Sequence, residues 1–308
     1  MAGFAQGSRT NLRYIKETTF GTTPETPTMV ELPYTTHSLN LTKERVSGND
    51  IQADRMPRVD RHGNRQVSGD INVDLRKGDY DPFLESAMFN TFSTDTLKVG
   101  TSPQYFTIED AALDISQFQL FTGMAVSSMN VSLAPNQMVT TGFTMVGKDG
   151  EISGTTASTA LTDITGNAPF DSYSGDLQLA DVGGSLAAVT TVQSLDFTLN
   201  NSLSPTFVIG DATAPQLEYG RAEIEGTIAA YFEDASLVNR FIDETETQLE
   251  VSVDDPTGSN TYTFLFPRIK INSAEIGVEG PNSRIVNMSF IALYDSVEDS
   301  NLTITRTA

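Results

Sequence analysis

Apolar and polar residues alternate along several strand-like segments of this chain. From Val67 to Leu75 the odd positions are Val, Gly, Ile, Val and Leu, and the even positions are all polar. Ile224, Ile228 and Phe232 keep the same register in a second segment. A period of two is that of a β-strand with one face in the core and one in solvent. A shift by one residue would bury carboxylates, so the pattern predicts strands of fixed register.

A second pair of segments alternates in the same way. Residues 129–133 alternate Met, Val and Leu with polar residues, and residues 274–278 alternate Ala, Ile and Val with Glu and Gly. Each half then turns at a Pro-Asn pair, Pro135-Asn136 and Pro281-Asn282. Strand signals of this kind dominate the chain, so we expect a mainly β protein.

Part of the sequence occurs twice. Residues 38–42, Ser-Leu-Asn-Leu-Thr, return at 194–198 as Ser-Leu-Asp-Phe-Thr, a spacing of 194 − 38 = 156. Residues 63–71 return at 220–228, a spacing of 220 − 63 = 157. Gly, Ser, Thr and Ala become frequent between 150 and 186, as in a linker. We expect an N-terminal arm (1–30), a first domain (31–150), a linker or edge loop (151–188) and a second domain (189–308). A duplicated β unit is typical of building blocks that stack or form rings.

One short helix is expected in each repeat, at 81–89 and at 234–242. Asp81 suits the cap of the first turn, and Pro82 suits the first helical position, where its missing N–H costs nothing. An apolar stripe follows in both repeats, which predicts that each helix covers one end of a sheet. The stripe residues are Phe83, Leu84, Ala87 and Met88, then Leu237, Val238, Phe241 and Ile242.

Both repeats contain a long polar loop at the same place. The first lies between Thr42 and Gly63 and is too long for a tight hairpin. The second runs from Leu199 to Gly220 and is less basic. Loops in matching places suggest arms that contact other subunits, and a solvated flap is the alternative. The candidate contact residues of the first loop are Lys43, Arg45, Arg55, Arg58 and Arg61.

Composition narrows the possible functions. The formal charge of −21 disfavours a sequence-independent grip on DNA phosphates. The chain has no Cys, which excludes disulfides and thiolate metal sites, and it has no Trp. No basic and apolar signal segment opens the sequence, and no apolar run approaches the ~20 residues of a membrane helix. We therefore expect a chain that is made in a cytoplasm and has no membrane partner.

Signals for catalysis or metal binding are weak. Asp254-Asp255 could resemble the carboxylate pair of a glycosidase or bind Ca²⁺, but it lies in a turn sequence that lacks the EF-hand spacing. His37 and His62 have no neighbouring ligand, so a zinc site is not expected. Gly63 and Gly69 fit turns or close backbone packing better than phosphate binding. We expect no enzyme activity, no cofactor and no metal.

Three further segments are distinctive: Gly7–Pro24 (GSRTNLRYIKETTFGTTP), Arg61–Val67 (RHGNRQV) and Gly78–Leu84 (GDYDPFL). These segments resemble a known family, the tail tube (major tail) proteins of long-tailed bacteriophages. The resemblance implies β-sandwich tube domains, here two in tandem, each with one short flanking α-helix. It also implies subunits that form stacked rings, and a hollow tube that delivers DNA. Implied partners are the chain itself and the tail terminator, tape-measure and distal tail proteins, in a virion tail assembled in the host cytoplasm.

The repeat and this resemblance lead to one functional hypothesis. Three chains with two repeats each would form a pseudo-sixfold ring. With about four wall strands per repeat, about 24 strands would enclose a wide lumen. Double-stranded DNA would pass without specific binding. The expected lumen-facing residues are Asp70, Asn72, Asp74, Asn130, Glu225, Thr227 and Glu275.

Another class of protein stays open at this point. A two-domain β-sandwich that binds carbohydrate, or an adhesin, would also explain the duplication and the many Thr, Ser and Asn residues. The missing Trp argues against it, since aromatic faces usually contact sugars. Such a module would remain a soluble monomer, whereas a tube subunit would polymerise.

Overall fold

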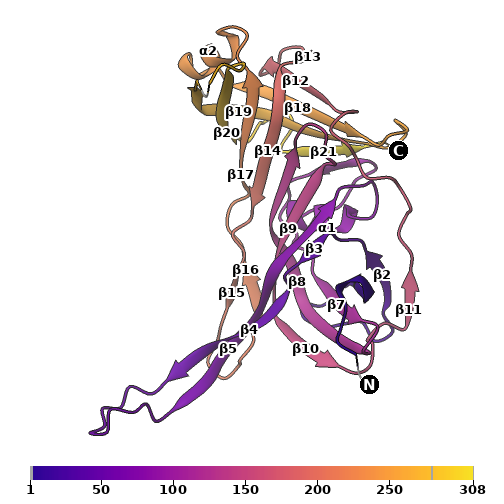
Figure 1. The fold of residues 1–308 in the computed structure, drawn as a ribbon, viewed down its shortest axis with the longest axis vertical. Helices are drawn as coiled ribbons and strands as arrows, with labels where there is room; N and C mark the ends of the chain where they lie inside the picture. The colour runs from indigo at the N-terminus through magenta and orange to yellow at the C-terminus, as the bar shows by residue number, and fades with distance from the viewer. Residues whose placement is uncertain (1–2, 279, 308) are drawn as a thin grey trace.

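Strands make up most of the computed structural model, which describes residues 3–278 and 280–307 (Figure 1). The expected mainly β class is confirmed. The first half contains η1 (Gly7–Arg9), β1 (Thr10–Lys16), β2 (Thr28–Leu32), β3 (Thr36–His37), β4 (Asn40–Ser47), β5 (Asp60–Asp74), α1 (Asp81–Met88), β6 (Thr96–Lys98), β7 (Phe106–Ala112), β8 (Gln117–Leu133), β9 (Thr140–Gly147) and β10 (Asp149–Ser153).

The remaining elements follow from residue 160 onward. They are β11 (Ala160–Thr162), β12 (Asp176–Asp181), β13 (Ala187–Ala188), β14 (Val192–Asn200), β15 (Ser204–Thr206), β16 (Gln216–Glu218), β17 (Glu223–Tyr231), α2 (Ser236–Ile242), β18 (Thr247–Asp254), β19 (Thr261–Ile276), β20 (Ile285–Ala292) and β21 (Thr303–Arg306). Residues 1–2 of the predicted arm and residues 279 and 308 of the predicted second domain lie outside the described residues.

Strands of the two halves pair in the same order. The first half pairs β1-β7-β8-β9-β5-β4, and the second pairs β12-β18-β19-β20-β17-β14, all antiparallel. The long strands β8 and β19 each change partner along their length. Each has an extra residue just past the change, Ser127 within the ladder of β8 with β9 and Asn272 within the ladder of β19 with β20. A bulge bends a strand, so one strand serves two sheets in each half.

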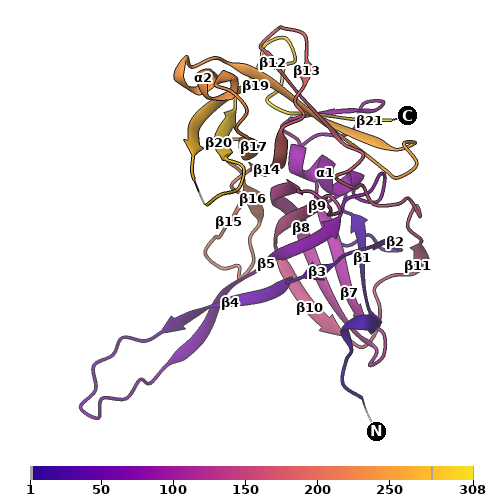
Figure 2. The ribbon, with the colours of Figure 1, turned by 45° about the horizontal axis from the view of Figure 1, so that its top comes forward.

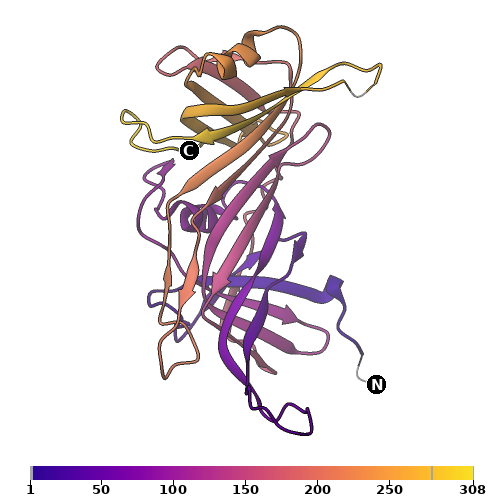
Figure 3. The same cartoon turned by 90° about the vertical axis from the view of Figure 1, so that its left-hand side faces the viewer.

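A further pairing joins the halves. The end of β8 pairs with β14 over six residues, with Asn130 opposite Thr198. This joint makes one continuous sheet, in the order β4-β5-β9-β8-β14-β17-β20-β19. Figure 3 shows strands of the first half in purple and magenta beside strands of the second half in orange.

Strand pairing also refines the spacing of the repeat. In the ladders, Asn40 lies opposite Ser68, and Thr198 lies opposite Glu225. With β5 and β17 spaced by 157, Asn40 corresponds to Thr198, a spacing of 198 − 40 = 158. The sequence match at 156 is therefore displaced by two residues along the first strand. A two-residue displacement keeps every side chain on the same face.

The alternating segments face as expected. Val67, Ile71 and Val73 of β5 are fully buried, whereas Asp70 and Asn72 are exposed. The buried side chains pack on aromatic rings of other elements. Phe83 of α1 lies 5.0 Å from the ring of Tyr14, 5.0 Å from Phe106 and 5.5 Å from Phe143. Phe83 thus ties β1, β7 and β9 together.

The ends of the predicted domains differ from the strand boundaries. Residues 10–16, inside the predicted N-terminal arm, form β1, whose Leu12 and Tyr14 are buried. Residues 176–181, inside the predicted linker, form β12 and pair with β18. The sequence did not separate these strands from the flanking polar residues because their partners, β7 and β18, are distant in the chain.

Both predicted helices are present, but two details were wrong. Asp81 is not the cap: Tyr80 occupies that position, without a side-chain cap bond. The carboxylate of Asp81 instead binds Arg306 and Tyr262. The apolar stripe of α1 is buried, but that of α2 is incomplete, because Phe241 and Ile242 are exposed. Among residues 3–278 and 280–307, nothing buries these two side chains at the end of α2.

Two glycines, Gly69 of β5 and Gly226 of β17, allow the backbone of the neighbouring strand to approach closely. A Cβ on Gly69 would lie 2.5 Å from the backbone oxygen of Ser38, and its φ is +153°. A Cβ on Gly226 would lie 2.7 Å from the backbone oxygen of Asp196. Close backbone packing was expected at Gly69, and the contact with Ser38 agrees with it. Gly226 lies 157 positions later and occupies the equivalent place in the second half.

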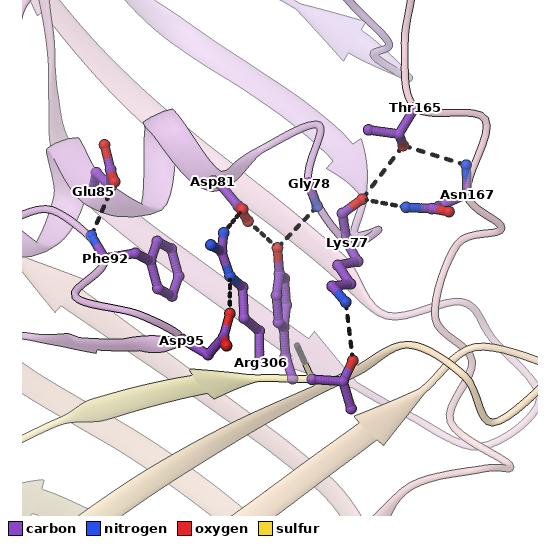
Figure 4. A network of polar contacts seen from close by, with 11 residues as sticks. Lys77, Gly78, Asp81, Glu85, Phe92, Asp95, Thr165, Asn167 and Arg306 are labelled. Atoms are coloured by element: carbon purple, nitrogen blue, oxygen red, sulfur yellow. Dashed lines mark hydrogen bonds and ion pairs between the residues drawn. The ribbon is translucent and has the colours of Figure 1, made fainter.

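The C-terminal strand is fastened to the first half of the chain (Figure 4). β21 pairs with β6 as well as β19. The guanidinium of Arg306 donates to Asp95 at 3.0 Å, binds Asp81 and stacks over Phe92 at 4.3 Å. Burial raises the pKa of Tyr262, whose hydroxyl donates to Asp81, and the charge of that carboxylate raises it further.

Candidate assembly surfaces

One face of the continuous sheet is polar, and we call it the polar face. The ladders place residues from six strands side by side on it. Asn72, Gly142, Asn130, Thr198 and Glu225 form one row across β5, β9, β8, β14 and β17. The row beside it runs from Asp74 through Thr140, Ser132, Asp196 and Thr227 to Ser289 of β20.

All seven expected lumen-facing residues lie on the polar face. Glu275 joins it from β19, opposite Asn287 of β20. Asp74 is half-buried and the other six are exposed. Two further acids on this face, Asp196 and Glu223, were missed. The alternation of residues 195–199 could have found Asp196, since it lies between the buried Leu195 and Phe197.

Hydrogen bonds hold the polar face in order. The hydroxyl of Thr144 donates to Asp70 at 2.7 Å, and the amide of Asn72 donates to Thr36 at 3.0 Å. A Cβ on Gly142 would collide with the side-chain oxygen of Asn130 and lie 2.9 Å from that of Asn72. Gly142 therefore leaves the space that these two amides occupy between the strands. The carboxylates project from a rigid surface.

A long hairpin leaves the body of the molecule at one end of this sheet (Figure 2). We call residues 43–63 the first arm; it contains the end of β4 and the start of β5. All five candidate contact residues, Lys43, Arg45, Arg55, Arg58 and Arg61, are exposed on it. Arg45 donates to Asp60 at 2.8 Å, and Arg58 binds Asp54. The arm also exposes apolar side chains, of which Ile51 is 99% exposed.

The equivalent segment of the second half lies against the first half. We call residues 201–220 the second arm; it contains β15 and β16. Leu203 and Leu217 are buried with Phe89 and Ala125 in one small cluster. The ring of Tyr219 meets that of Phe89 edge-on at 5.1 Å. The two arms thus differ in this chain: the second is docked and the first is free at its tip.

Neither surface has the features of a catalytic or metal site. Within residues 3–278 and 280–307, no group of three or more His, Asp and Glu side chains could hold a metal ion. Nε2 of His37 lies 3.6 Å from Asp110, whereas His62 lies on the first arm. The pKa of Asp110 is raised, because the effect of burial is larger than the opposing effect of His37. The Asp254-Asp255 segment forms the expected turn, in which Asp255 accepts from Thr257 and Asn260.

No helix in the described part of the chain is long and apolar enough to span a membrane. Both helices are short, and the longer, α1, has eight residues.

Comparison with known proteins identifies the family. The model of the phage tail tube protein family matches residues 7–292, nearly the whole chain. No curated protein matches the chain. The match includes the three segments on which the resemblance rests, and it extends through both sets of strands. The chain therefore belongs to the phage tail tube protein family.

Proposed function

We propose that three copies of this chain close into a pseudo-sixfold ring, and that stacked rings form the tail tube through which DNA is ejected. The chain is a structural component of the virion tail, as its family indicates. The β8–β14 joint carries the proposal, because it already links two strand sets of the same order within one chain. A head-to-tail contact of this kind closes into a ring when its rotation permits.

β4 and β19, the two outer strands of the continuous sheet, could pair between chains in the way that β14 and β8 pair within one chain. The extra residues of β8 and β19 are 272 − 127 = 145 apart, so Asn130 corresponds to Glu275. Thr198 corresponds to Asn40, which lies 158 positions earlier. The joint between two chains would therefore place Glu275 of one chain opposite Asn40 of the next. Among the described residues, β4 pairs only with β5, and residues 273–276 of β19 pair only with β20.

Burial at the two outer edges supports this joint. At the joint inside the chain, Met129, Val131 and Leu199 are buried. Their counterparts at the free edges, Ala274, Ile276 and Leu41, are only half-buried and pack at the margin of the core. Pairing β19 with β4 of another chain would bury this apolar surface, which favours association.

A ring of three chains would present about 24 strands, with about four from each repeat, enough for a wide lumen. In this proposal the polar face lines the lumen. Its carboxylates repel DNA phosphates, so the duplex slides without binding. The arm tips, with Ile51 and Arg55 on the first and Ile209 on the second, contact the adjacent ring.

The remaining expectations belong to this proposal. The protein acts without catalysis or cofactor, assembles in the host cytoplasm, and meets tail terminator, tape-measure and distal tail proteins at the tube ends. These expectations derive from family membership and from the absence of a catalytic arrangement in the sequence.

Cross-linking tests the ring directly, because the chain has no Cys of its own. We expect a chain with Asn40→Cys and Glu275→Cys to form disulfides between chains on mild oxidation. Three chains of 33.3 kDa would then run as one covalent ring on a non-reducing gel. Negative-stain images of the same sample should show rings or hollow tubes.

A matched pair controls for thiol reactivity. Asn130→Cys with Thr198→Cys bridges the existing joint, so it should form a disulfide within one chain. If this control forms its disulfide while the Asn40 and Glu275 pair stays monomeric at all concentrations, the ring proposal fails. A soluble monomer would then favour the two-domain binding module.

A further inference from the structure

The second arm contacts the first half of the chain beside the β8–β14 joint. The side chain of Asn201 donates to the backbone oxygen of Ala87, at the end of α1, at 2.8 Å. The backbone N–H of Leu203 donates to the hydroxyl of Ser127, the extra residue of β8, at 3.2 Å. Leu203, Leu217 and Tyr219 then cover Phe89, which is 4% exposed. The dock thus consists of the end of α1 and the bulge of β8.

The same place on the second half is uncovered. The helix repeat aligns Phe89 with Ile242, and the bulges align Ser127 with Asn272. Ile242 is 65% exposed, Phe241 is 36% exposed, and Asn272 is exposed as well. An apolar helix end that is buried in one half and bare in the other marks a surface that a further unit covers.

We propose that the first arm docks on the end of α2 of the adjacent chain in the same ring, through Arg45 against the acidic residues that follow the helix. The inference rests on the proposed ring, and it adds a lateral contact to the contacts of the arm tips between rings. The occupant is a second copy of this chain, because the first arm holds the place in the first half that the second arm holds in the second half.

Arm equivalence follows from the strand ladders. Val46 pairs with Arg61 in the first arm, and Ser204 pairs with Glu218 in the second. Ser204 follows Val46 by 158 positions, and Glu218 follows Arg61 by 157 positions. These are the spacings that relate β4 to β14 and β5 to β17. Leu203, Leu217 and Tyr219 therefore correspond to Arg45, Asp60 and His62, which share one side of the first arm.

The two docks use different chemistry. Inside the chain, apolar side chains of the second arm meet Phe89 and Ala125. Between chains, Arg45 and Asp60 would meet an end of α2 followed by Asp243, Glu244 and Glu246. Lys270, which corresponds to Ala125, lies there and binds Glu244 at 2.6 Å. Asp60 can pair with Lys270 while Arg45 pairs with Glu244, and the aliphatic stem of Arg45 can cover Ile242.

A consequence is that the two arms cannot exchange docks. The first arm would bring the charged pair Arg45 and Asp60 onto the apolar cluster at Phe89, where both side chains would lose hydration and find no further polar partner in that cluster. The second arm would place apolar side chains against the charged pair of Glu244 and Lys270, and it would offer neither of them a charged partner. This difference selects the correct neighbour at each joint, because unfavourable contacts at the wrong site contribute to specificity.

Charge reversal in the disulfide-trapping background tests the dock. We expect Arg45→Glu to slow ring formation by the Asn40→Cys and Glu275→Cys chain on the order of tenfold, since like charges meet across the joint. Glu244→Arg alone should slow it similarly. The chain with both reversals should recover most of the rate, which a variant with a damaged arm would not do. Arg9→Glu, an equal charge reversal at an exposed position of η1 outside both arms, is the matched control and should leave the trapping rate unchanged.

The outcomes separate the two proposals. If the parent chain forms the covalent ring but Arg45→Glu has no effect, or if Glu244→Arg fails to restore the rate, the dock is wrong and the ring stands. If the parent chain never forms the ring, the proposed function fails first. Recovery only in the double reversal supports the contact between Arg45 and Glu244.

Discussion

A single carboxylate organises the turn between β18 and β19. Oδ1 of Asp255 accepts from the hydroxyl of Thr257 at 2.8 Å and from the N–H of Ser259 at 3.1 Å. Oδ2 accepts from the side chain of Asn260 at 2.7 Å. Burial alone would raise the pKa of Asp255, but these hydrogen bonds favour the ionised form and lower the pKa to about 2.

The pH dependence of stability follows from this shift. A carboxyl whose pKa is lower in the folded chain stabilises the fold above its ordinary pKa of 3.8. That stabilisation is lost as the pH falls from about 4 towards 2. We expect thermal unfolding of Asp255→Asn to depend less on pH across this range than unfolding of the natural chain. Equal slopes would exclude the role given to Asp255, and Asp50→Asn, at an exposed position of the first arm, is the control.

Residue roles of this kind were predictable only where the partners are close in sequence. Thr257, Ser259 and Asn260 are within five positions of Asp255, and the turn was expected from them. Asp81 was expected to cap α1, but its partners Tyr262 and Arg306 are 181 and 225 positions away. Local patterns do not contain such contacts, because they are created when β19 and β21 return to the first half.

At the scale of elements, β21 fastens the second half onto α1. Arg306 bridges Asp81 of the helix and Asp95 next to β6, and all three side chains are half-buried. We expect Arg306→Leu to lower the free energy of unfolding by about 2 kcal/mol, since two carboxylates lose a charged donor. Chemical denaturation measures this, with the exposed Arg221→Leu as control. A loss no larger than that of the control would contradict the role.

The strands with clear alternation were predictable, and the edges of the repeats were not. β5, β8 and β17 follow the predicted period of two and face as the pattern requires. β1 and β12 were assigned to an arm and a linker, although Leu12 and Leu179 are buried. The apolar stripe of α2 was expected to be buried like that of α1, but its end residues Phe241 and Ile242 are exposed. The sequence contains the stripe, but it does not tell what covers it.

At the scale of the whole molecule, the polar face gathers acids that are far apart in sequence. Asp70 and Glu225 come from different repeats, and the β8–β14 joint places them on one surface. The repeat and the alternation were sufficient to expect a shared polar face. They did not reveal the joint itself, because edge pairing depends on which strands are left free after each half has folded.

The charge of this face leads to the last prediction. Interactions between exposed charges extend about 8 Å at physiological ionic strength, so in the proposed tube the carboxylates of the polar face would act on DNA that passes close to them. Replacing Asp70, Asp74 and Glu225 by Lys turns repulsion of phosphates into attraction. We expect particles with these tubes to assemble and to eject their genome on the order of tenfold more slowly, with the delay shrinking as salt increases.

Two comparisons make this result specific to the polar face. The same number of Lys substitutions at Glu25, Asp114 and Glu151, which are exposed away from it, changes the net charge equally. Those particles should eject at the natural rate, because the added charges would not face the duplex. If both variants slow ejection alike, net charge rather than the polar face is responsible. If neither does, the polar face does not line the path of the DNA, and the carboxylates would serve to keep the chain soluble before it assembles.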